Sequence, residues 1–124
     1  MRVLLLNSWN DDRGTTAIEF AVVGPAFIAL IVGMLFSSLC LFALGSLHYA
    51  VEQGARCASV RTAVCSDAST TVSYAKTQYF GPSAPTFTYA TAACGNSVSG
   101  SLNYPVHLGL TQVSVPLAAT ACFP

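Results

Sequence analysis

Charged side chains are scarce in this sequence. Asp, Glu, Lys and Arg make up 8% of its 124 residues, five acidic and five basic, so the formal net charge is zero. Soluble domains carry about 25% charged residues, and this composition therefore excludes an ordinary water-soluble globular protein. The sequence also has no block of like charges. We expect no nucleic-acid partner, because binding to a phosphate backbone needs clustered positive charge.

Sequence patterns typical of catalysis are missing as well. The chain has no nucleophile elbow, no phosphate-binding loop and no paired carboxylates outside its first residues. We therefore expect no enzyme activity and no cofactor. The cysteines show no C-x-x-C spacing, and His48 lies within the apolar part of the chain. A zinc site is thus the less favoured interpretation of the cysteines, and we expect no bound metal.

The most prominent feature that is present is a long apolar run. Between Glu19 and Glu52 the sequence has no Asp, Glu, Lys or Arg over the 32 residues 20–51. A membrane-spanning helix needs about 20 apolar residues. As a helix the run would measure about 48 Å, against a hydrocarbon core of about 30 Å. We therefore expect one helix that crosses a lipid bilayer and projects beyond it, since so short a chain could not bury it.

The chain divides into three parts around this run. We expect residues 1–14 to form a cytoplasmic leader, residues 15–47 the transmembrane helix, and residues 48–124 a domain outside the cytoplasm. Small and apolar residues continue at helical spacing, which predicts that the helix extends as a stem to residue 65. They are Val51, Ala55, Ala58, Thr62 and Cys65. Within this stem we expect Arg56 to pair with Glu52, four residues before it.

The remainder of the chain predicts a short helix followed by a small antiparallel sheet. Residues 66–80 favour a helix that starts near Asp67, and two prolines within 81–85 prevent it from continuing. Alternating residues rich in Thr and aromatics predict strands. These strands cover 86–92, 97–104 and 110–115, with a turn at 94–96. The predicted fold class is α+β, with a long N-terminal helix, a short helix and a small sheet.

Four of the five cysteines follow the apolar run and indicate two disulfides. An even number of cysteines in a small domain is typical of an oxidising compartment, and four cysteines allow three connectivities. Cys57 and Cys65 would lie about 12 Å apart along one regular helix, so they can pair only if the helix breaks between them. We favour a bond between Cys94 and Cys122 and leave Cys57 and Cys65 open. Cys40, inside the run, is expected to act as a small apolar side chain.

Glu19 is a carboxylate one turn inside the apolar helix, where it is costly without a partner. The residues from 13 to 20 read RGTTAIEF. This string resembles the processing site of type IV prepilins, which implies cleavage after Gly14 and a new α-amino group on Thr15. The ammonium and the Glu19 carboxylate can pair within one helix or between neighbouring helices. Pairing between subunits would set their axial stagger.

Residues 13–56 resemble the N-terminal region of TadE-like proteins, pseudopilins of the tight-adherence (Flp pilus) secretion systems. The matching residues are Arg13-Gly14, Ala17, Glu19-Phe20-Ala21, Pro25, Gly33, Ala50 and Gly54-Ala55-Arg56. The resemblance implies a pilin-like fold and an inner-membrane precursor, cut by a prepilin peptidase, whose C-terminal domain lies in the periplasm or, after assembly, outside the cell. It implies a minor structural role in building an adhesive pilus, with other pilins and the inner-membrane assembly platform as partners. Recognition and assembly then fall to Arg13, Glu19, Phe20 and Pro25.

Two other functions remain as alternatives. Ala43-Leu44-Gly45 fits a signal-peptidase site, and cleavage there would release a secreted, disulfide-rich binding module that begins at Ser46. Against this, the apolar run is far longer than the core of an ordinary signal peptide, which has about 7–15 residues. The chain could also act as an uncleaved single-pass membrane subunit.

Overall fold

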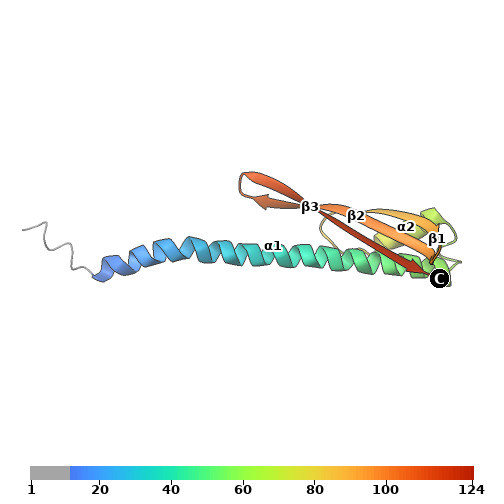
Figure 1. Ribbon diagram of the computed structural model, residues 1–124, viewed down its shortest axis with the longest axis horizontal. Coiled ribbons are helices and arrows are strands. Elements are labelled where there is room, and N and C mark those ends of the chain that lie inside the picture. Colours follow the sequence, from blue (N-terminus) through green and yellow to red (C-terminus); the bar gives the residue numbers. More distant parts are fainter. Residues whose placement is uncertain (1–11) are drawn as a thin grey trace, which may run out of the picture. The chain divides into compact units, whose positions relative to one another are not determined.

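The computed structural model describes residues 12–124, with the side chains of residues 12–14 and 108 left aside, and most of the predicted leader lies outside this part. The chain divides into two compact units, residues up to 36 and residues 37–124. A long N-terminal helix, a short helix and a three-stranded antiparallel sheet confirm the predicted α+β class (Figure 1). The elements are α1 (Asp12–Val60), α2 (Ala68–Thr77), β1 (Thr86–Ala92), β2 (Gly95–Leu108) and β3 (Thr111–Phe123).

Helix α1 is shorter at its C-terminal end than predicted. The expected stem to residue 65 is wrong, because α1 ends at Val60 and a turn follows. In this turn the N–H groups of Val64 and Cys65 donate to the Arg61 carbonyl at 2.9 and 3.0 Å. The cause is covalent: a disulfide holds the Cα atoms of Cys57 and Cys65 at 5.8 Å, whereas eight residues of regular helix separate Cα atoms by about 12 Å.

Helix α2 begins with a capping box, close to where the sequence predicts it. The Asp67 carboxylate accepts the Thr70 backbone N–H at 2.8 Å, and the Asp67 N–H donates to Thr70 Oγ1 at 3.1 Å. These bonds satisfy backbone donors that a helix start otherwise leaves free. The bond from the Thr70 N–H, followed by that from the Ser69 hydroxyl, holds the pKa of Asp67 below its ordinary value.

The sheet has the order β1-β2-β3, and both pairings are antiparallel. The predicted strand 86–92 is confirmed, but the other two strands run through Pro105 and Pro116, beyond their predicted ends at 104 and 115. Both prolines are tolerated because β1 pairs with β2 only as far as Ser101 and β3 is an edge strand. The first turn occupies residues 93–94, so Gly95, with φ +117°, already starts β2.

The core of the second unit lies between α1 and the sheet. Gly100 permits the closest approach, since a Cβ there would lie 2.8 Å from both Leu47 Cδ1 and Phe87 Cε1. Fully or nearly fully buried side chains from α1, α2 and the sheet make up this core. They include Ala43, Leu47, Ala50, Val51, Ala55, Ala75, Phe87, Val98, Leu102, Tyr104, Leu117 and Ala119.

A chain of hydrogen bonds fixes the end of α1 to all three strands. The Tyr89 hydroxyl donates to Asn96 Oδ1, and Asn96 Nδ2 donates to Ser59 Oγ at 2.9 Å. Ser59 Oγ in turn donates to the Phe123 carbonyl at 3.0 Å. Since Ser59 is in α1 and its partners come from β1, β2 and β3, this network sets the register between the helix and the sheet.

Candidate functional site

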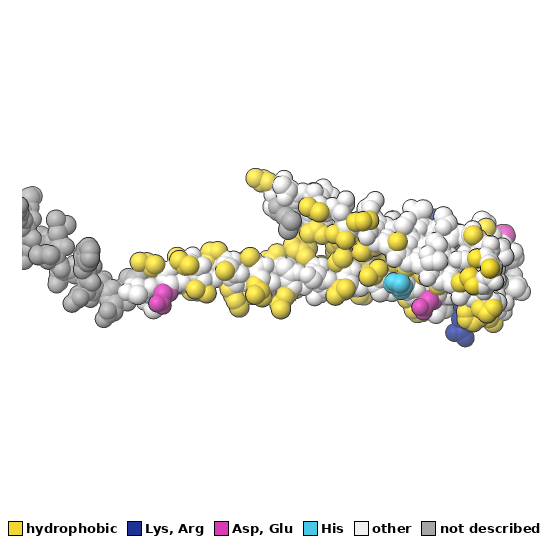
Figure 2. Space-filling view, in the orientation of Figure 1, with side chains coloured by type: hydrophobic (Ala, Val, Ile, Leu, Met, Phe, Trp, Pro, Cys, Tyr) yellow, Lys and Arg dark blue, Asp and Glu magenta, His cyan; other side chains and the backbone are white. Residues whose placement is uncertain are grey.

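The part of α1 that lies in the first unit exposes apolar side chains around its whole circumference. The exposed large side chains between residues 18 and 35 are Ile18, Phe20, Val22, Val23, Phe27, Ile28, Leu30, Ile31, Val32, Met34 and Leu35. Figure 2 shows yellow apolar side chains along both edges of this part of the helix, with one acidic group near its start. A helix that is hydrophobic on all sides is stable in lipid or packed among other helices.

Residues 15–60 of α1 are long and apolar enough to cross a membrane, by length and composition. The segment's most apolar 18-residue window has a mean hydropathy of 2.6 and is 6% buried, and no other helix in residues 12–124 meets this description. A core helix of a soluble domain of comparable hydropathy would be mostly buried. The exposure of the segment therefore favours lipid, or other helices, as its surroundings.

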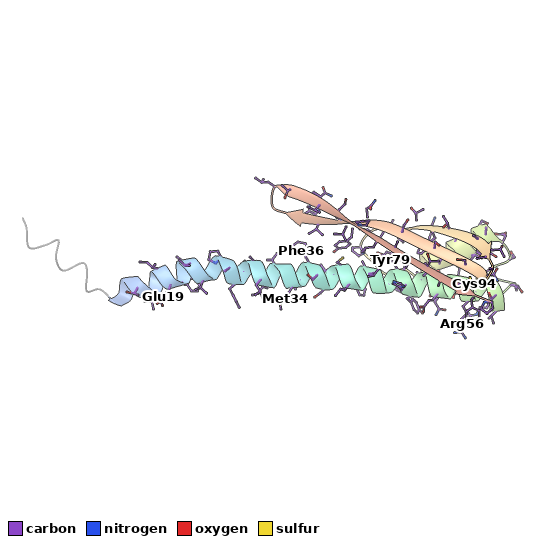
Figure 3. All side chains as sticks on the ribbon, viewed as in Figure 1. Glu19, Met34, Phe36, Arg56, Tyr79 and Cys94 are labelled. Atoms are coloured by element: carbon purple, nitrogen blue, oxygen red, sulfur yellow. A yellow bond between two sulfur atoms is a disulfide. The ribbon has the colours of Figure 1, made fainter. Side chains whose placement is uncertain are left out.

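Glu19 carries the only formal charge between Thr15 and Val51. It is exposed on the first unit, and its neighbour Phe20 is 79% exposed (Figure 3). An ionised carboxylate surrounded by apolar side chains is unfavourable in a bilayer unless a cation or hydrogen-bond donor approaches it. Within this apolar stretch, Glu19 is thus the position at which a positively charged partner would be stabilised by an ion pair.

Pro25 interrupts the backbone hydrogen bonds of α1 without ending the helix. Because proline has no N–H, the carbonyl of Ala21 loses its partner four residues ahead. A shallow apolar hollow surrounds this point, lined by Phe20, Ala21, Val23, Gly24, Pro25, Phe27 and Ile28. The hollow can accommodate an apolar side chain of a neighbouring helix. The missing hydrogen bond allows α1 to bend at this point.

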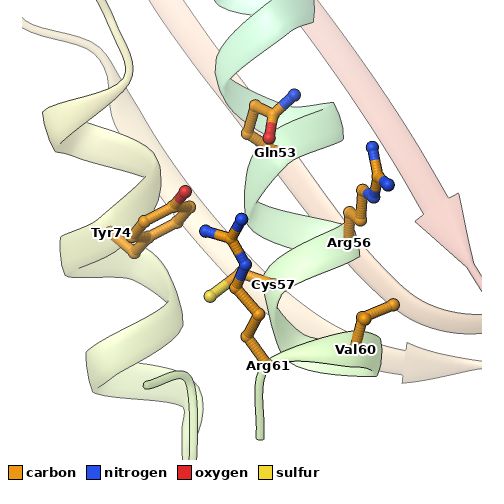
Figure 4. A pocket seen from close by; sticks show the side chains of 6 residues that line it. All are labelled: Gln53, Arg56, Cys57, Val60, Arg61 and Tyr74. Carbon is orange, nitrogen blue, oxygen red and sulfur yellow. The ribbon is translucent and has the colours of Figure 1, made fainter. Parts of the chain in front are cut away.

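A second candidate site is a small basic pocket of about 170 Å³ at the C-terminal end of α1. Its lining residues are Gln53, Arg56, Cys57, Val60 and Arg61 from α1 and the following residue, and Tyr74 from α2. Figure 4 shows the Arg61 side chain turned toward Tyr74 and that of Arg56 turned away from it. The Arg61 guanidinium and the Tyr74 phenol, which lie on the same side of the pocket, suit an anionic group such as a carboxylate.

The expected ion pair between Glu52 and Arg56 is wrong. Within the described residues, Glu52, Arg56 and Arg61 have no ionic partner. All three are exposed, and an exposed ion pair contributes at most about 1 kcal/mol, which is too little to hold two long side chains in one geometry. The positive charge of the pocket is therefore available to a ligand or a neighbouring subunit.

The structure contains two disulfides, as predicted. Cys57 is bonded to Cys65 and Cys94 to Cys122, with Cα–Cα distances of 5.8 and 6.2 Å. The four cysteines are consumed by these bonds, and the competing zinc interpretation is therefore wrong. Cys40 is a free thiol that packs against the core, as a small apolar side chain does.

The candidate residues of the N-terminal motif lie along one stretch of α1. The helical backbone includes Gly14 and Thr15, while the side chain of Arg13 lies outside the described part. The basic pocket was not found from the sequence. The one sequence feature that could have indicated the pocket is that two arginines, Arg56 and Arg61, follow a single acidic residue, Glu52. No sequence feature indicated that Tyr74 would line it.

A single exposed apolar helix joined to a small disulfide-bonded α+β unit fits a membrane-anchored, single-pass protein. Residues 14–56, 43 of 124 residues, match the family model of TadE-like proteins. The match covers Glu19, Phe20, Pro25 and Arg56, and it supports a structural, pilus-associated role. Searches of the curated proteins and of the solved structures found no match.

Proposed function

We propose that this protein is a minor pilin-like subunit for biogenesis of a tight-adherence (Flp) pilus, cut by a prepilin peptidase between Gly14 and Thr15. One observation carries the proposal. Within the matched segment, the exposed apolar part of α1 from residue 15 to residue 36 has a single carboxylate, Glu19, which becomes the fifth residue after the cut. The subunit assembles through this helix, and it has no catalytic role.

The proposed cut supplies the partner that Glu19 needs. It creates an ammonium group on Thr15, four residues before Glu19, or about 6 Å along the helix axis. In the membrane the two groups pair within one chain, and in the pilus the Glu19 carboxylate pairs with Thr15 of a neighbouring subunit. Apolar side chains of α1 then pass from lipid to neighbouring helices while one charge pair fixes the stagger.

The proposed topology places residues 1–14 in the cytoplasm, residues 15–47 in the inner membrane and residues 48–124 in the periplasm. The two disulfides of the second unit support an oxidising compartment for the last part. The partners are the prepilin peptidase, other pilins of the same pilus, the inner-membrane assembly platform and the lipid bilayer. Residues 48–124 are carried outside the cell if the subunit enters the filament.

The packing of α1 argues against cleavage by signal peptidase before Ser46. The Gly45–Ser46 bond lies inside α1, and Ala43 is fully buried in the core of the second unit. Ser46 Oγ accepts the Phe80 N–H at 2.7 Å. Removal of the residues before Ser46 would take Ala43 and Cys40 out of this core. A free module that starts there would lose part of its own packing.

Intact mass of the membrane-extracted protein, from a strain with its own prepilin peptidase, tests the processing step. We expect a chain that begins at Thr15, and a Gly14→Phe variant that keeps its leader because a bulky residue no longer fits the peptidase. A wild-type chain that begins at Ser46 would identify a secreted module. One that still begins at Met1 would identify an uncleaved membrane subunit, and either result overturns the proposal.

A pair of charge variants tests the assembly step. Glu19→Ala is expected to be processed but to give a loss of piliation, since the neighbour's ammonium has no acceptor. The matched control is Glu52→Ala, which removes an exposed carboxylate of the same helix outside the first unit. Pili are counted by electron microscopy. Normal piliation with Glu19→Ala, or an equal loss with both variants, would contradict the role of Glu19.

A further inference from the structure

The basic pocket at the C-terminal end of α1 has no part in the proposed assembly through Glu19. It lies wholly within the second unit. Gln53, Cys57 and Arg61 recur at four-residue spacing, so their side chains follow one another along one side of the helix. Tyr74 of α2 lies opposite this side, and Figure 4 shows the Arg61 guanidinium beside it. The pocket is therefore formed between two helices and not on the outer surface of one.

Three backbone hydrogen bonds fix the position of Arg61. Its N–H donates to the Cys57 carbonyl at 2.8 Å, which continues the hydrogen-bond pattern of α1 one residue past Val60. Its carbonyl accepts the N–H groups of Val64 and Cys65 at 2.9 and 3.0 Å. The Cys57–Cys65 disulfide closes the same turn. Since the backbone is already held, binding of a ligand by Arg61 costs only the ordering of its side chain.

Packed side chains form the floor and one wall of the pocket. Cys57 is 2% exposed, and Tyr74 packs against the cluster that contains the disulfide. Helices α1 and α2 approach closely beside this cluster, because a Cβ on Gly54 would lie 3.1 Å from the Ala75 Cβ. Ala75 follows Tyr74 in the sequence of α2. The close contact therefore fixes the part of α2 that carries Tyr74, and with it the width of the pocket.

The groups that line the pocket are mainly hydrogen-bond donors. Within the described residues no Asp or Glu lines it, and Arg56 and Arg61 have no ionic partner in residues 12–124. A guanidinium has five N–H donors and no acceptor, and a phenol and an amide can each donate as well. Arg56, on the other side of the pocket, adds a second positive charge. The complementary ligand is therefore an anion.

A carboxylate of another protein is the anion that fits these surroundings. The planar guanidinium matches the two oxygens of a carboxylate, and a volume of about 170 Å³ suits a single side chain. Val60 lines the pocket and is 63% exposed. An apolar group beside arginine and tyrosine is typical of protein interfaces, in which these two residue types are enriched. A lipid headgroup is less suitable, because Arg61 comes ten residues after Val51, the end of the apolar run.

We propose that the basic pocket binds the carboxylate of an Asp or Glu side chain presented by another protein. Arg61 donates to the carboxylate oxygens, and the Tyr74 hydroxyl donates a further hydrogen bond. Arg56 attracts the negative charge from the rim. This contact is separate from the ion pair of Glu19, and it depends neither on the proposed cleavage nor on assembly through the first unit.

Arginine side-chain NMR of the full chain in an uncharged detergent tests the binding. The sequence has four arginines, Arg2, Arg13, Arg56 and Arg61, so each Nε–H signal can be assigned by substitution. The probe is the blocked peptide acetyl-Ala-Glu-Ala-amide, whose only charge is the glutamate side chain. The same peptide with glutamine is the uncharged control. We expect the glutamate peptide to shift the Arg61 signal until it saturates, and the glutamine peptide to have no effect.

Two variants and a matched control locate the binding site. Arg61→Gln, followed through the Arg56 signal, is expected to weaken binding about tenfold or more, because charge-assisted hydrogen bonds are lost. Tyr74→Phe keeps the packed ring and should weaken binding several-fold. Lys76→Gln is the control, since it removes an exposed positive charge of α2 two residues from Tyr74, on a different face of the helix. It should bind as the wild-type chain does.

Three results would overturn the inference. The first is a lack of saturable change at Arg61, or equal shifts of all four arginine signals. The second is equal weakening by Lys76→Gln and Arg61→Gln, which would mean attraction by net charge alone. The third comes from inorganic phosphate used in place of the peptides. If phosphate shifts the Arg61 signal and the glutamate peptide does not, the pocket binds a phosphate group and the proposed carboxylate ligand is wrong.

Discussion

The two disulfides close loops of very different length, and alanine substitution of each pair should separate their effects on stability. Cys94 and Cys122 are 28 residues apart, whereas Cys57 and Cys65 are 8 apart. The chain-entropy relation gives about 3.6 kcal/mol for the longer loop and about 2.5 kcal/mol for the shorter one. The difference of about 1 kcal/mol comes only from the unfolded chain, which a longer cross-link restricts more.

The loss of buried side-chain packing is expected to be greater for Cys57 and Cys65, which is opposite to the effect of loop length on stability. The two contributions therefore have to be measured separately. Cys57 and Cys65 are 2% and 4% exposed, so their replacement by alanine also removes packed sulfur atoms. Cys94 is exposed and Cys122 is half-buried, and their packing loss is smaller. Comparing each double-alanine variant with the wild-type chain, both fully reduced, gives the packing part alone. The same variant and the wild-type chain are then compared with their disulfides oxidised. Subtracting the packing part from this difference in unfolding free energy gives the contribution of loop closure, which we call the closure part.

The assay is urea unfolding of the full chain in detergent, followed by the near-ultraviolet circular dichroism of tyrosine. All five tyrosines lie in the second unit, so the signal reports on that unit alone. We expect the closure part to be larger for the Cys94–Cys122 bond. A closure part for Cys57–Cys65 that equals or exceeds it would refute the entropic reasoning.

Three further substitutions test the second unit by the same urea assay. Gly95→Ala should lower stability by about 1–3 kcal/mol, because φ is +117° and the new Cβ would lie 2.4 Å from a β3 carbonyl oxygen; unchanged stability would contradict the strained geometry. Asp67→Ala should remove a pH dependence: the Thr70 N–H lowers the Asp67 pKa, so this stabilisation is present above the ordinary carboxyl pKa and is lost as the pH falls through the lowered one. A wild-type chain with the same acid profile as the variant would rule this out. Asn96→Ala removes two hydrogen bonds and should cost about 1–3 kcal/mol, while Asn103→Ala, at an exposed position of β2, should cost less.

Elements with strong local signals were predictable from the sequence. The apolar run, the Asp67 cap and the alternation in β1 each depend on neighbouring residues only, and each is found within a few residues of its predicted position. The break in α1 was foreseen as a condition for a bond between Cys57 and Cys65. The spacing of apolar residues could not reveal it, because a helical pattern continues through residues that a disulfide pulls out of the helix.

The ends of β2 and β3 depended on non-local information. Pro105 and Pro116 normally end strands, and whether a proline fits is decided by which side of its strand has a partner. That side is known only once β1 is seen to stop pairing at Ser101. The basic pocket is a similar case, since α2 brings Tyr74 beside Arg61 only in the folded unit. For the N-terminal motif the sequence was more informative, because its residues lie along a single helix.

The order of the disulfides along the chain has a consequence for biosynthesis. The bonds join the first cysteine after the apolar run to the second, and the third to the fourth. Of the three possible connectivities, this is the only one whose first bond can close before the third cysteine has entered the oxidising compartment, since a chain emerges from its N-terminal side. Cys57 and Cys65 can therefore be oxidised while the sheet is still being delivered, and they then no longer compete for Cys94 and Cys122. Correct pairing then follows from the direction of synthesis, without a step of disulfide exchange.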